Sequence, residues 1–134
     1  MNNQRLVSRL LAAPKELAAS GNVPSSFADM NNRHDYTFLV AVGKTTATGV
    51  KVELLGSNDS GGSGSETIKE ITFTKTSSDS GHLFVIRGRV TPDYRYMGVK
   101  VTNLDTSTAS TAAVLLVSDA LYVPDDEGVT VVQV

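Results

Sequence analysis

The middle of the chain alternates between short apolar runs and polar, glycine-rich segments, a pattern typical of many short strands. Residues 50–54 place valine or leucine at every second position, with Lys51 and Glu53 between them, and residues 97–101 repeat this period of two. Helices are disfavoured here because the runs are rich in β-branched residues, which lose side-chain freedom in a helix. The pattern predicts six strands, at residues 36–42, 49–55, 67–74, 82–90, 94–103 and 112–123.

One of these runs departs from simple alternation. In residues 82–90 the apolar residues are consecutive, so that Leu83 and Val85 oppose Phe84 and Ile86. This predicts a strand that is buried on both faces for part of its length. Polar turns separate the runs, and the longest of them, GSNDSGGSGS at residues 56–65, is expected to be a flexible hairpin loop. Short strands with turns at this spacing predict an all-β fold, an antiparallel β-sandwich.

The first 35 residues are interpreted as an N-terminal arm and lead-in, and residues 36–134 as the β-sandwich domain. Apolar residues near the start recur at helical spacing: Leu6, Val7, Leu10, Leu11 and Leu17. Pro14 suits the first position of a second short helix, and Gly21 suits a stop. We therefore expect residues 1–22 to form an amphipathic arm, helical for one or two turns or extended. Its apolar stripe either packs on its own sandwich or docks on a neighbour.

The end of the chain also carries apolar residues. After an acidic turn at residues 124–128, the sequence continues with Val129, Val131, Val132 and Val134. This pattern predicts a C-terminal strand with free edges to satisfy. The strand either closes its own sheet or pairs with the edge of another subunit.

Composition and charge narrow the function classes. The chain has no cysteine, which excludes disulfides and thiolate metal sites. A net charge of -2 gives no electrostatic reason to expect nucleic acid or an anionic membrane as partner. The sequence shows neither a secretory signal nor an apolar run of about twenty residues, so we expect no membrane helix and assembly in the cytoplasm.

The motifs that suggest chemistry are incomplete. Gly43-Lys44-Thr45 resembles the end of a phosphate-binding loop, but Phe38 replaces its first glycine and a strand follows it. His34 and His82 lie far apart, with no second metal ligand at close spacing. The acidic residues 125–127 lack the alternating oxygen ligands of a calcium loop. We therefore expect no catalytic, cofactor-binding or metal-binding residues, no cofactor and no enzymatic activity.

Basic residues occur in two runs that are consecutive in the sequence: Arg87, Arg89, Arg95 and Lys100. Strand alternation places Arg87 and Arg89 on the same side of their strand. The four residues either form a basic face for an acidic partner or remain a solvated surface.

The stretch from Tyr36 to Tyr122 resembles small structural proteins that tailed phages encode beside the major capsid gene. The resemblance is carried by KVELLGSNDS, ITFTKT, HLFVIRGRV and PDYRYMGVKVTN, the last being similar to the closing hairpin of a jelly-roll-like sandwich. It implies a capsid decoration, or cement, subunit of the virion, assembled in the host cytoplasm. Its expected partners are the major capsid protein and copies of itself, with a trimer favoured over other homo-oligomers.

On this interpretation both ends of the chain and one basic pair contact partners. The expected contact residues are Leu6, Leu10, Leu11 and Leu17 in the arm, Val129, Val131 and Val134 in the terminal strand, and Arg87 and Arg89. The alternative is a ligand- or glycan-binding sandwich of a phage tail, fibre or baseplate. That function would place the contacts in the loops at residues 57–65 and 105–110.

Overall fold

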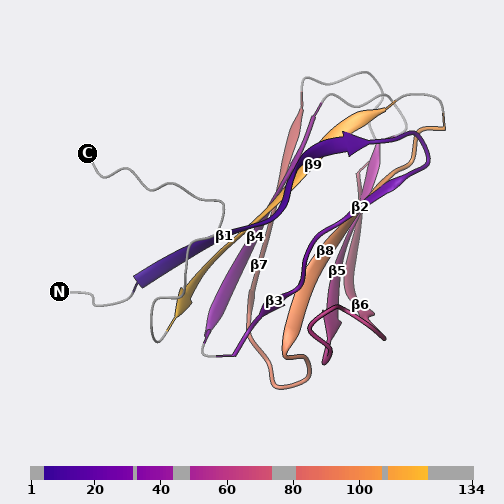
Figure 1. The fold of residues 1–134 in the computed structure, drawn as a ribbon. Helices are drawn as coiled ribbons and strands as arrows, with labels where there is room; N and C mark the ends of the chain where they lie inside the picture. Colours follow the sequence, from indigo (N-terminus) through magenta and orange to yellow (C-terminus); the bar gives the residue numbers. More distant parts are fainter. Residues whose placement is uncertain (1–4, 32, 44–48, 74–80, 107–108, 121–134) are drawn as a thin grey trace, which may run out of the picture.

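The computed structural model describes residues 5–31, 33–43, 49–73, 81–106 and 109–120, with residues 5–7 and 118–120 as backbone only. The described chain forms strands and no helix, in two facing antiparallel sheets (Figure 1). The strands are β1 (Arg5–Leu17), β2 (Asn22–Pro24), β3 (Ala28–Asp29), β4 (Asp35–Val42), β5 (Val50–Ser57), β6 (Glu66–Phe73), β7 (His82–Arg89), β8 (Tyr96–Asn103) and β9 (Ser110–Ala120). The predicted β-sandwich is thus confirmed, and the described residues contain no helix that could span a membrane.

The strand order identifies the sandwich as a jelly roll. Sheet A has the order β1-β9-β4-β7, and sheet B has the order β2-β8-β5-β6, with β3 also paired to β8. The pairs are therefore nested: β1 with β9, β2 and β3 with β8, β4 with β7, and β5 with β6. This is one long antiparallel ribbon wrapped into two sheets, which is the jelly-roll topology. The jelly-roll-like sandwich that the resemblance implied is therefore the topology observed.

The six predicted strands correspond to β4 through β9, with their ends shifted by at most about two residues where both ends are described. The period of two is preserved in β5 and β8, where Val50, Val52, Val99 and Val101 point into the core. The end of the last predicted run, residues 121–123, lies outside the described residues.

The helical prediction for the N-terminal arm was wrong. Residues 5–17 form β1, an edge strand of sheet A that pairs with β9 from Arg5 opposite Ala120 to Leu17 opposite Ser110. Two register shifts, between Leu10 and Ala12 and between Ala12 and Lys15, insert extra residues into β1. These bulges break the period of two, so the apolar spacing imitates a helix.

Prolines explain why the early strands were missed. Pro14 lies within the second irregular stretch of β1, and Pro24 ends the three-residue strand β2. Both strands lie at sheet edges, where a missing backbone N–H removes no ladder hydrogen bond. Strands β2 and β3 have three and two residues, too short to show a period.

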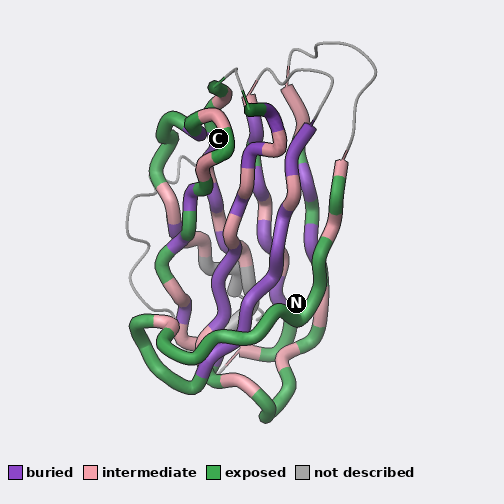
Figure 2. The backbone as a smooth tube through the Cα atoms, turned by 90° about the vertical axis from the view of Figure 1, so that its right-hand side faces the viewer, coloured by how far each residue is buried: buried purple, intermediate pink, exposed green. Residues whose placement is uncertain are grey.

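The core lies between the two sheets, and buried segments run side by side through the molecule (Figure 2). The largest fully buried side chains come from both sheets: Phe38, Leu17, Met30, Leu116, Val23, Val40, Val50, Val52, Val99, Val101 and Val114. Each contributes about 1.5–3 kcal/mol relative to an exposed position. Residues 5–29 supply Leu11, Leu17 and Val23 to this core, so the segment interpreted as an arm is part of the sandwich.

Candidate interaction surface

The outer face of sheet A, the side turned away from the core, carries an unusual row of apolar residues. Directly opposed residues of antiparallel strands point to the same face. The register therefore aligns Val85 of β7 with Leu39 of β4, Leu39 with Leu115 of β9, and Leu115 with Leu10 of β1. The residues that alternate with this row, such as Phe38 and Leu116, are fully buried in the core. The row thus crosses all four strands on the solvent side.

A second row runs beside the first, with Leu83, Ala41 and Ala113 in register. Leu83 is 56% exposed and Val85 is 46% exposed, whereas Leu39 and Leu115 in the middle of the sheet are half-buried by their neighbours. Val117 lies on the same face of β9 as Leu115, opposite Thr37 of β4. We name the whole set the apolar outer face: Leu10, Leu39, Ala41, Leu83, Val85, Ala113, Leu115 and Val117. Exposed apolar residues that lie side by side across a whole sheet mark an interaction surface.

The exposure of β7 corrects a prediction. The consecutive apolar run in residues 82–90 was expected to be buried on both faces. Phe84 and Ile86 are buried, at 7% and 8% exposure, but Leu83 and Val85 belong to the apolar outer face. The double-sided apolar pattern was correct, and the inference that the protein itself covers both sides was wrong.

The outer face of sheet B carries charged side chains, and Glu53 at its centre pairs with lysines of the same face. Glu53 accepts a hydrogen bond from Thr67 Oγ1 at 3.1 Å, and its carboxylate lies 3.5 Å from Lys51 Nζ and 3.7 Å from Lys100 Nζ. Burial alone would raise the pKa of Glu53. The Thr67 hydrogen bond and the two lysine charges outweigh burial and lower that pKa. A self-paired polar surface of this kind is the ordinary solvent face of a sandwich.

The predicted basic face does not form as one surface. Arg87 and Arg89 lie exposed on β7 of sheet A, with Arg89 Nε 3.6 Å from Asp35. Lys100 lies on sheet B beside Glu53, and Arg95 precedes β8 and pairs with Asp29. The runs containing Arg87 and Arg95 follow each other in the sequence, but the chain crosses from one sheet to the other between them.

The residues predicted to contact partners lie in different parts of the structure. Leu10 belongs to the apolar outer face, but Leu11 is 4% exposed and Leu17 is fully buried, so both stabilise the chain's own core. For Leu6 the structure gives the backbone, opposite Asp119. The C-terminal residues Val129, Val131 and Val134 lie outside the described residues, as do the acidic residues 125–127 and Lys44-Thr45.

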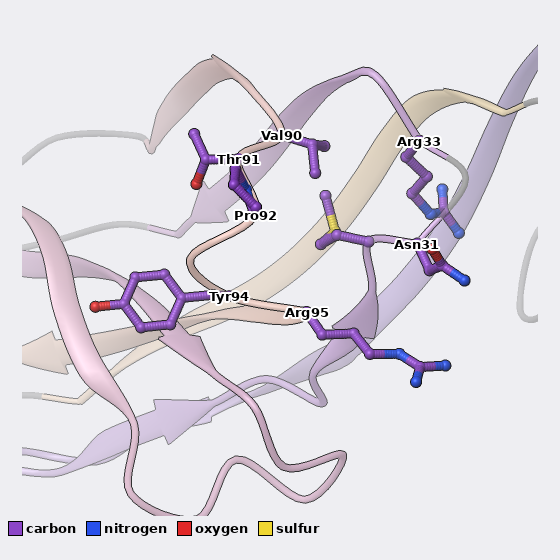
Figure 3. A pocket seen from close by; sticks show the side chains of 8 residues that line it. Asn31, Arg33, Val90, Thr91, Pro92, Tyr94 and Arg95 are labelled. Carbon is purple, nitrogen blue, oxygen red and sulfur yellow. The ribbon is translucent and has the colours of Figure 1, made fainter.

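A separate feature is an open cavity of about 390 Å³, lined by Met30, Asn31, Arg33, Val90, Thr91, Pro92, Tyr94 and Arg95. In Figure 3, Arg33 and Arg95 lie on one side of this cavity and Tyr94 on the other. Arg95 donates from Nε and Nη2 to the two carboxylate oxygens of Asp29, at 3.2 and 3.0 Å.

The charges of the cavity wall are partly neutralised. Burial would raise the pKa of Asp29, but hydrogen bonds from Arg95 and from the Asn31 N–H, with the charges of Arg95 and Arg33, lower it. Tyr94 donates from its hydroxyl to Glu66 at 2.6 Å, and this bond raises the pKa of Tyr94. The wall therefore offers aromatic and guanidinium groups, with much of its hydrogen-bonding capacity already used.

The loop at residues 57–65, expected to be flexible, is held by its own side chains. The Asp59 carboxylate accepts hydrogen bonds from the N–H groups of Gly61 and Ser63, and Ser57 Oγ donates to the Ser63 carbonyl at 2.7 Å. Asn58 donates to the carbonyl of Asp93 and accepts from the N–H of Arg95, which joins the loop to the cavity rim. Serine and aspartate thus fold this segment locally, despite its glycines.

The described residues contain no cluster of three His, Cys, Asp or Glu side chains that could hold a metal ion. His82 stacks on Phe73, with 4.0 Å between ring centroids, at the edge of the core. This contact gives His82 a packing role between β6 and β7.

Comparison with known proteins supports the fold and assigns no family. No model of a protein family matches the chain, and no curated protein matches it. Among solved structures, the chain is similar to the PBSX exported protein XepA, with 16% identity and a TM-score of 0.55, over 96% of this chain and 42% of XepA. It is also similar to the VP2 subviral particle of infectious bursal disease virus, with 6% identity and a TM-score of 0.53, over 89% of this chain and 33% of VP2.

A third similar structure is the SPBc2 prophage-derived protein YomS, with 8% identity and a TM-score of 0.50, over 90% of this chain and 97% of YomS. The matched region covers less than half of the length of XepA and of VP2, and nearly the whole length of YomS. At these identities the likeness establishes a shared β-sandwich fold.

Most of the apolar outer face was missed by sequence reasoning, although a signal for it exists. Residues 36–42 (YTFLVAV) and 112–117 (AAVLLV) are continuous apolar runs, like residues 83–86. All three runs are now seen to belong to sheet A, whereas the alternating runs belong to sheet B. Continuous apolar character in an antiparallel strand indicates two apolar faces, of which a two-sheet sandwich covers one.

Proposed function

We propose that the chain is a non-enzymatic structural subunit of a phage particle, a decoration subunit that binds the capsid lattice through the apolar outer face of sheet A. The observation that carries this proposal is the row Val85, Leu39, Leu115 and Leu10, which crosses a whole sheet on its solvent side. The fold needs no apolar residues there, because Phe38, Val40 and Leu116 already fill the inner face. Their presence is explained by a partner surface that removes them from water.

The fold comparisons are consistent with this function. A viral particle protein and two phage-related proteins, XepA and YomS, share the sandwich fold. The proposed location is the virion, and the proposed partner is the major capsid protein. A lattice presents many copies of one binding surface, so modest individual contacts suffice when subunits also contact each other.

The test is co-sedimentation of the purified protein with capsids assembled from the major capsid protein of the same genome. The double variant Leu39→Lys/Leu115→Lys places two charges in the middle of the apolar outer face and should lose binding by more than about tenfold. The matched control, Thr72→Lys/Thr102→Lys, adds the same charges to the outer side of sheet B and should bind as the wild type. Unfolding curves of both variants should match that of the wild type closely enough to show that the sandwich is intact.

Two results would contradict the proposal: a wild-type protein that does not sediment with capsids, or an outer-face variant that binds as well as the control. Either result would require another role for the apolar outer face.

The cavity supports a second candidate, a small-ligand or glycan module of a tail, fibre or baseplate. Arg33, Arg95 and Tyr94 line it, and the hydrogen-bonded loop 57–65 fixes its rim through Asn58. Guanidinium and aromatic groups suit a ligand that has both a carboxylate and a flat apolar face. Binding of acidic and neutral oligosaccharides, compared between wild type and Arg33→Ala, distinguishes the two: this function requires loss of binding, whereas the capsid function predicts no binding in either protein.

A further inference from the structure

The four edges of the sandwich differ in how they are protected against pairing with another strand. An edge strand exposes unpaired N–H and C=O groups, and proteins protect such edges with prolines, bulges, charges or short length. β1 has Pro14 and two register shifts, while β2 and β3 are two or three residues long and include Pro24. β6 has a register shift opposite Leu54 and Leu55, and its exposed residues include Glu66, Lys69 and Glu70.

The edge strand β7 lacks most of these protections, and its arginines, Arg87 and Arg89, lie towards one end. It pairs with β4 over eight consecutive residues without a register shift, from His82 opposite Val42 to Arg89 opposite Asp35. It contains no proline and no acidic residue. Its solvent side begins with Leu83 and Val85, two of the three large apolar residues that are most exposed in the described chain. A long, regular edge strand whose first half exposes apolar side chains is open to pairing with another strand.

We propose that this partner is β7 of a second copy, paired antiparallel about a twofold axis, so that two copies of sheet A form one continuous eight-stranded sheet. The pairing concerns self-association and does not depend on capsid binding. The other described edges are protected, which disfavours a head-to-tail contact between β7 and a different edge. A twofold contact uses the same surface on both copies, as in most homodimers. On this proposal the basic unit is a dimer, whereas the resemblance to phage proteins favoured a trimer.

The charges of β7 favour the antiparallel arrangement. Arg87 and Arg89 occupy one end of the strand, and Leu83 and Val85 occupy the solvent side of the other. If the twofold axis passes Val85, Val85 faces its own copy and Arg87 faces Leu83. If it passes Phe84, Leu83 faces Val85. In both registers no arginine faces an arginine, whereas a parallel pair in register would align all four and repel.

The pairing also has a geometric consequence. Directly opposed residues in an antiparallel pair lie on the same face, so the apolar outer faces of the two copies join on one side of the enlarged sheet. The dimer therefore presents a continuous apolar surface of twice the width, with Val85 of both copies near its centre.

Cysteine crosslinking tests this arrangement cleanly, because the natural chain contains no cysteine. In the register centred on Val85, Val85→Cys places two Cα atoms about 4.5–5.5 Å apart, within disulfide range. In the register centred on Phe84, a mixture of Leu83→Cys and Val85→Cys chains crosslinks instead. Ile68→Cys is the matched control, since Ile68 is 41% exposed on the protected edge β6. We expect rapid dimer crosslinks from one of the β7 arrangements and none from Ile68→Cys.

Sedimentation equilibrium gives the second measurement. The wild type should be a dimer, Val85→Lys should weaken association by more than about tenfold, and Ile68→Lys should leave it unchanged. A wild type that is still monomeric at about 1 mM overturns the proposal, as does a dimer that Val85→Lys does not weaken. Loss of the β7 crosslink when residues 121–134 are removed would also overturn it, because the C-terminal segment would then mediate the contact.

The outcomes separate this inference from the proposed function. A monomer that sediments with capsids contradicts the β7 pairing and supports capsid binding. A β7-linked dimer that ignores capsids supports the pairing and contradicts the proposed function.

Discussion

The two sheets of the sandwich use the same backbone pattern and the same core, yet their outer faces are opposite in character. On sheet B, Glu53 lies among Lys51, Lys100 and Thr67, and the charges balance within the chain. On sheet A, the corresponding positions of the central strands are Leu39 and Leu115. The inner faces of both sheets form the core and stabilise the fold. The two sheets differ only on their outer faces, so folding alone does not explain this difference. Sheet B presents a charged outer face to water, whereas sheet A presents the apolar surface on which the proposed capsid contact rests.

The largest effect should separate the two faces of a single strand. Phe38 is fully buried and Leu39, the next residue of β4, points outward. Phe38→Ala should lower the free energy of unfolding by about 3–5 kcal/mol, because it leaves a cavity between the sheets. Leu39→Ala should cost less than about 1 kcal/mol. Urea unfolding of both variants at a concentration that keeps the protein monomeric checks this, and equal costs would show that the monomer itself covers Leu39.

The next effect tests whether the charged face of sheet B is a stabilising network. Glu53→Ala should lower the free energy of unfolding by about 1–3 kcal/mol, since it removes the Thr67 hydrogen bond and leaves two lysines without their carboxylate. Glu70 lies directly opposite Glu53 on β6 and is exposed. Glu70→Gln should therefore be neutral or slightly stabilising, because it removes a like charge. The same unfolding assay would reject the network if both changes had equal effects.

A smaller effect should appear in the pH dependence of stability. The pKa of Glu53 is lower in the folded protein than the ordinary value of 4.5. The unfolded chain thus binds its proton first as the pH falls. The contribution of Glu53 is fully present above pH 4.5 and is lost as the pH falls through the folded pKa. Thermal unfolding between pH 7 and pH 3 should show a shallower loss for Glu53→Gln than for the wild type, and parallel curves would argue against this role.

The smallest effect concerns a charge pair at the end of the sandwich, where Asp29 ends β3 and Arg95 precedes β8. Asp29 and Arg95 form a bidentate pair, but their side chains are 43% and 56% exposed. Solvent screens such a pair, so Asp29→Asn should change the free energy of unfolding by about 0–1 kcal/mol. If Asp29→Asn lowered the free energy of unfolding as much as Glu53→Ala does, the exposure of a charge pair would be a poor guide to its contribution to stability.

The sequence was informative where strands alternate and misleading where they do not. Residues 50–54 and 97–101 obey the period of two, and β5 and β8 follow them. β1 was not recognisable, because its two bulges shift Leu11 and Leu17 out of the period. Such bulges depend on the partner strand β9, more than ninety residues later in the chain, and a local pattern contains no information about that partner.

The candidate surface was predictable in part. The consecutive apolar residues 83–86 were noticed, and the double-sided character they indicate was correct. What the local pattern does not contain is which strands share a sheet: β4, β7 and β9 do, and because a sandwich has two layers, one face of all three stays uncovered. Leu11 and Leu17 illustrate the reverse error, in which core residues were assigned to a partner because their own sheet was not recognised.

The nested strand pairs also limit the order in which the strands can pair during synthesis. β1 is made before the other described strands, but its pairing with β9 joins Arg5 to Ala120 at the opposite end of the described chain. Contacts between residues so distant in sequence make folding slow, since chain entropy must be lost before the contact stabilises anything. During synthesis the ribosome releases β1, β4 and β7 well before the strand that lies between β1 and β4 exists. Sheet A therefore depends on β9, and a nascent chain interrupted before residue 110 would leave the apolar side chains of β1 without the strand that pairs with it.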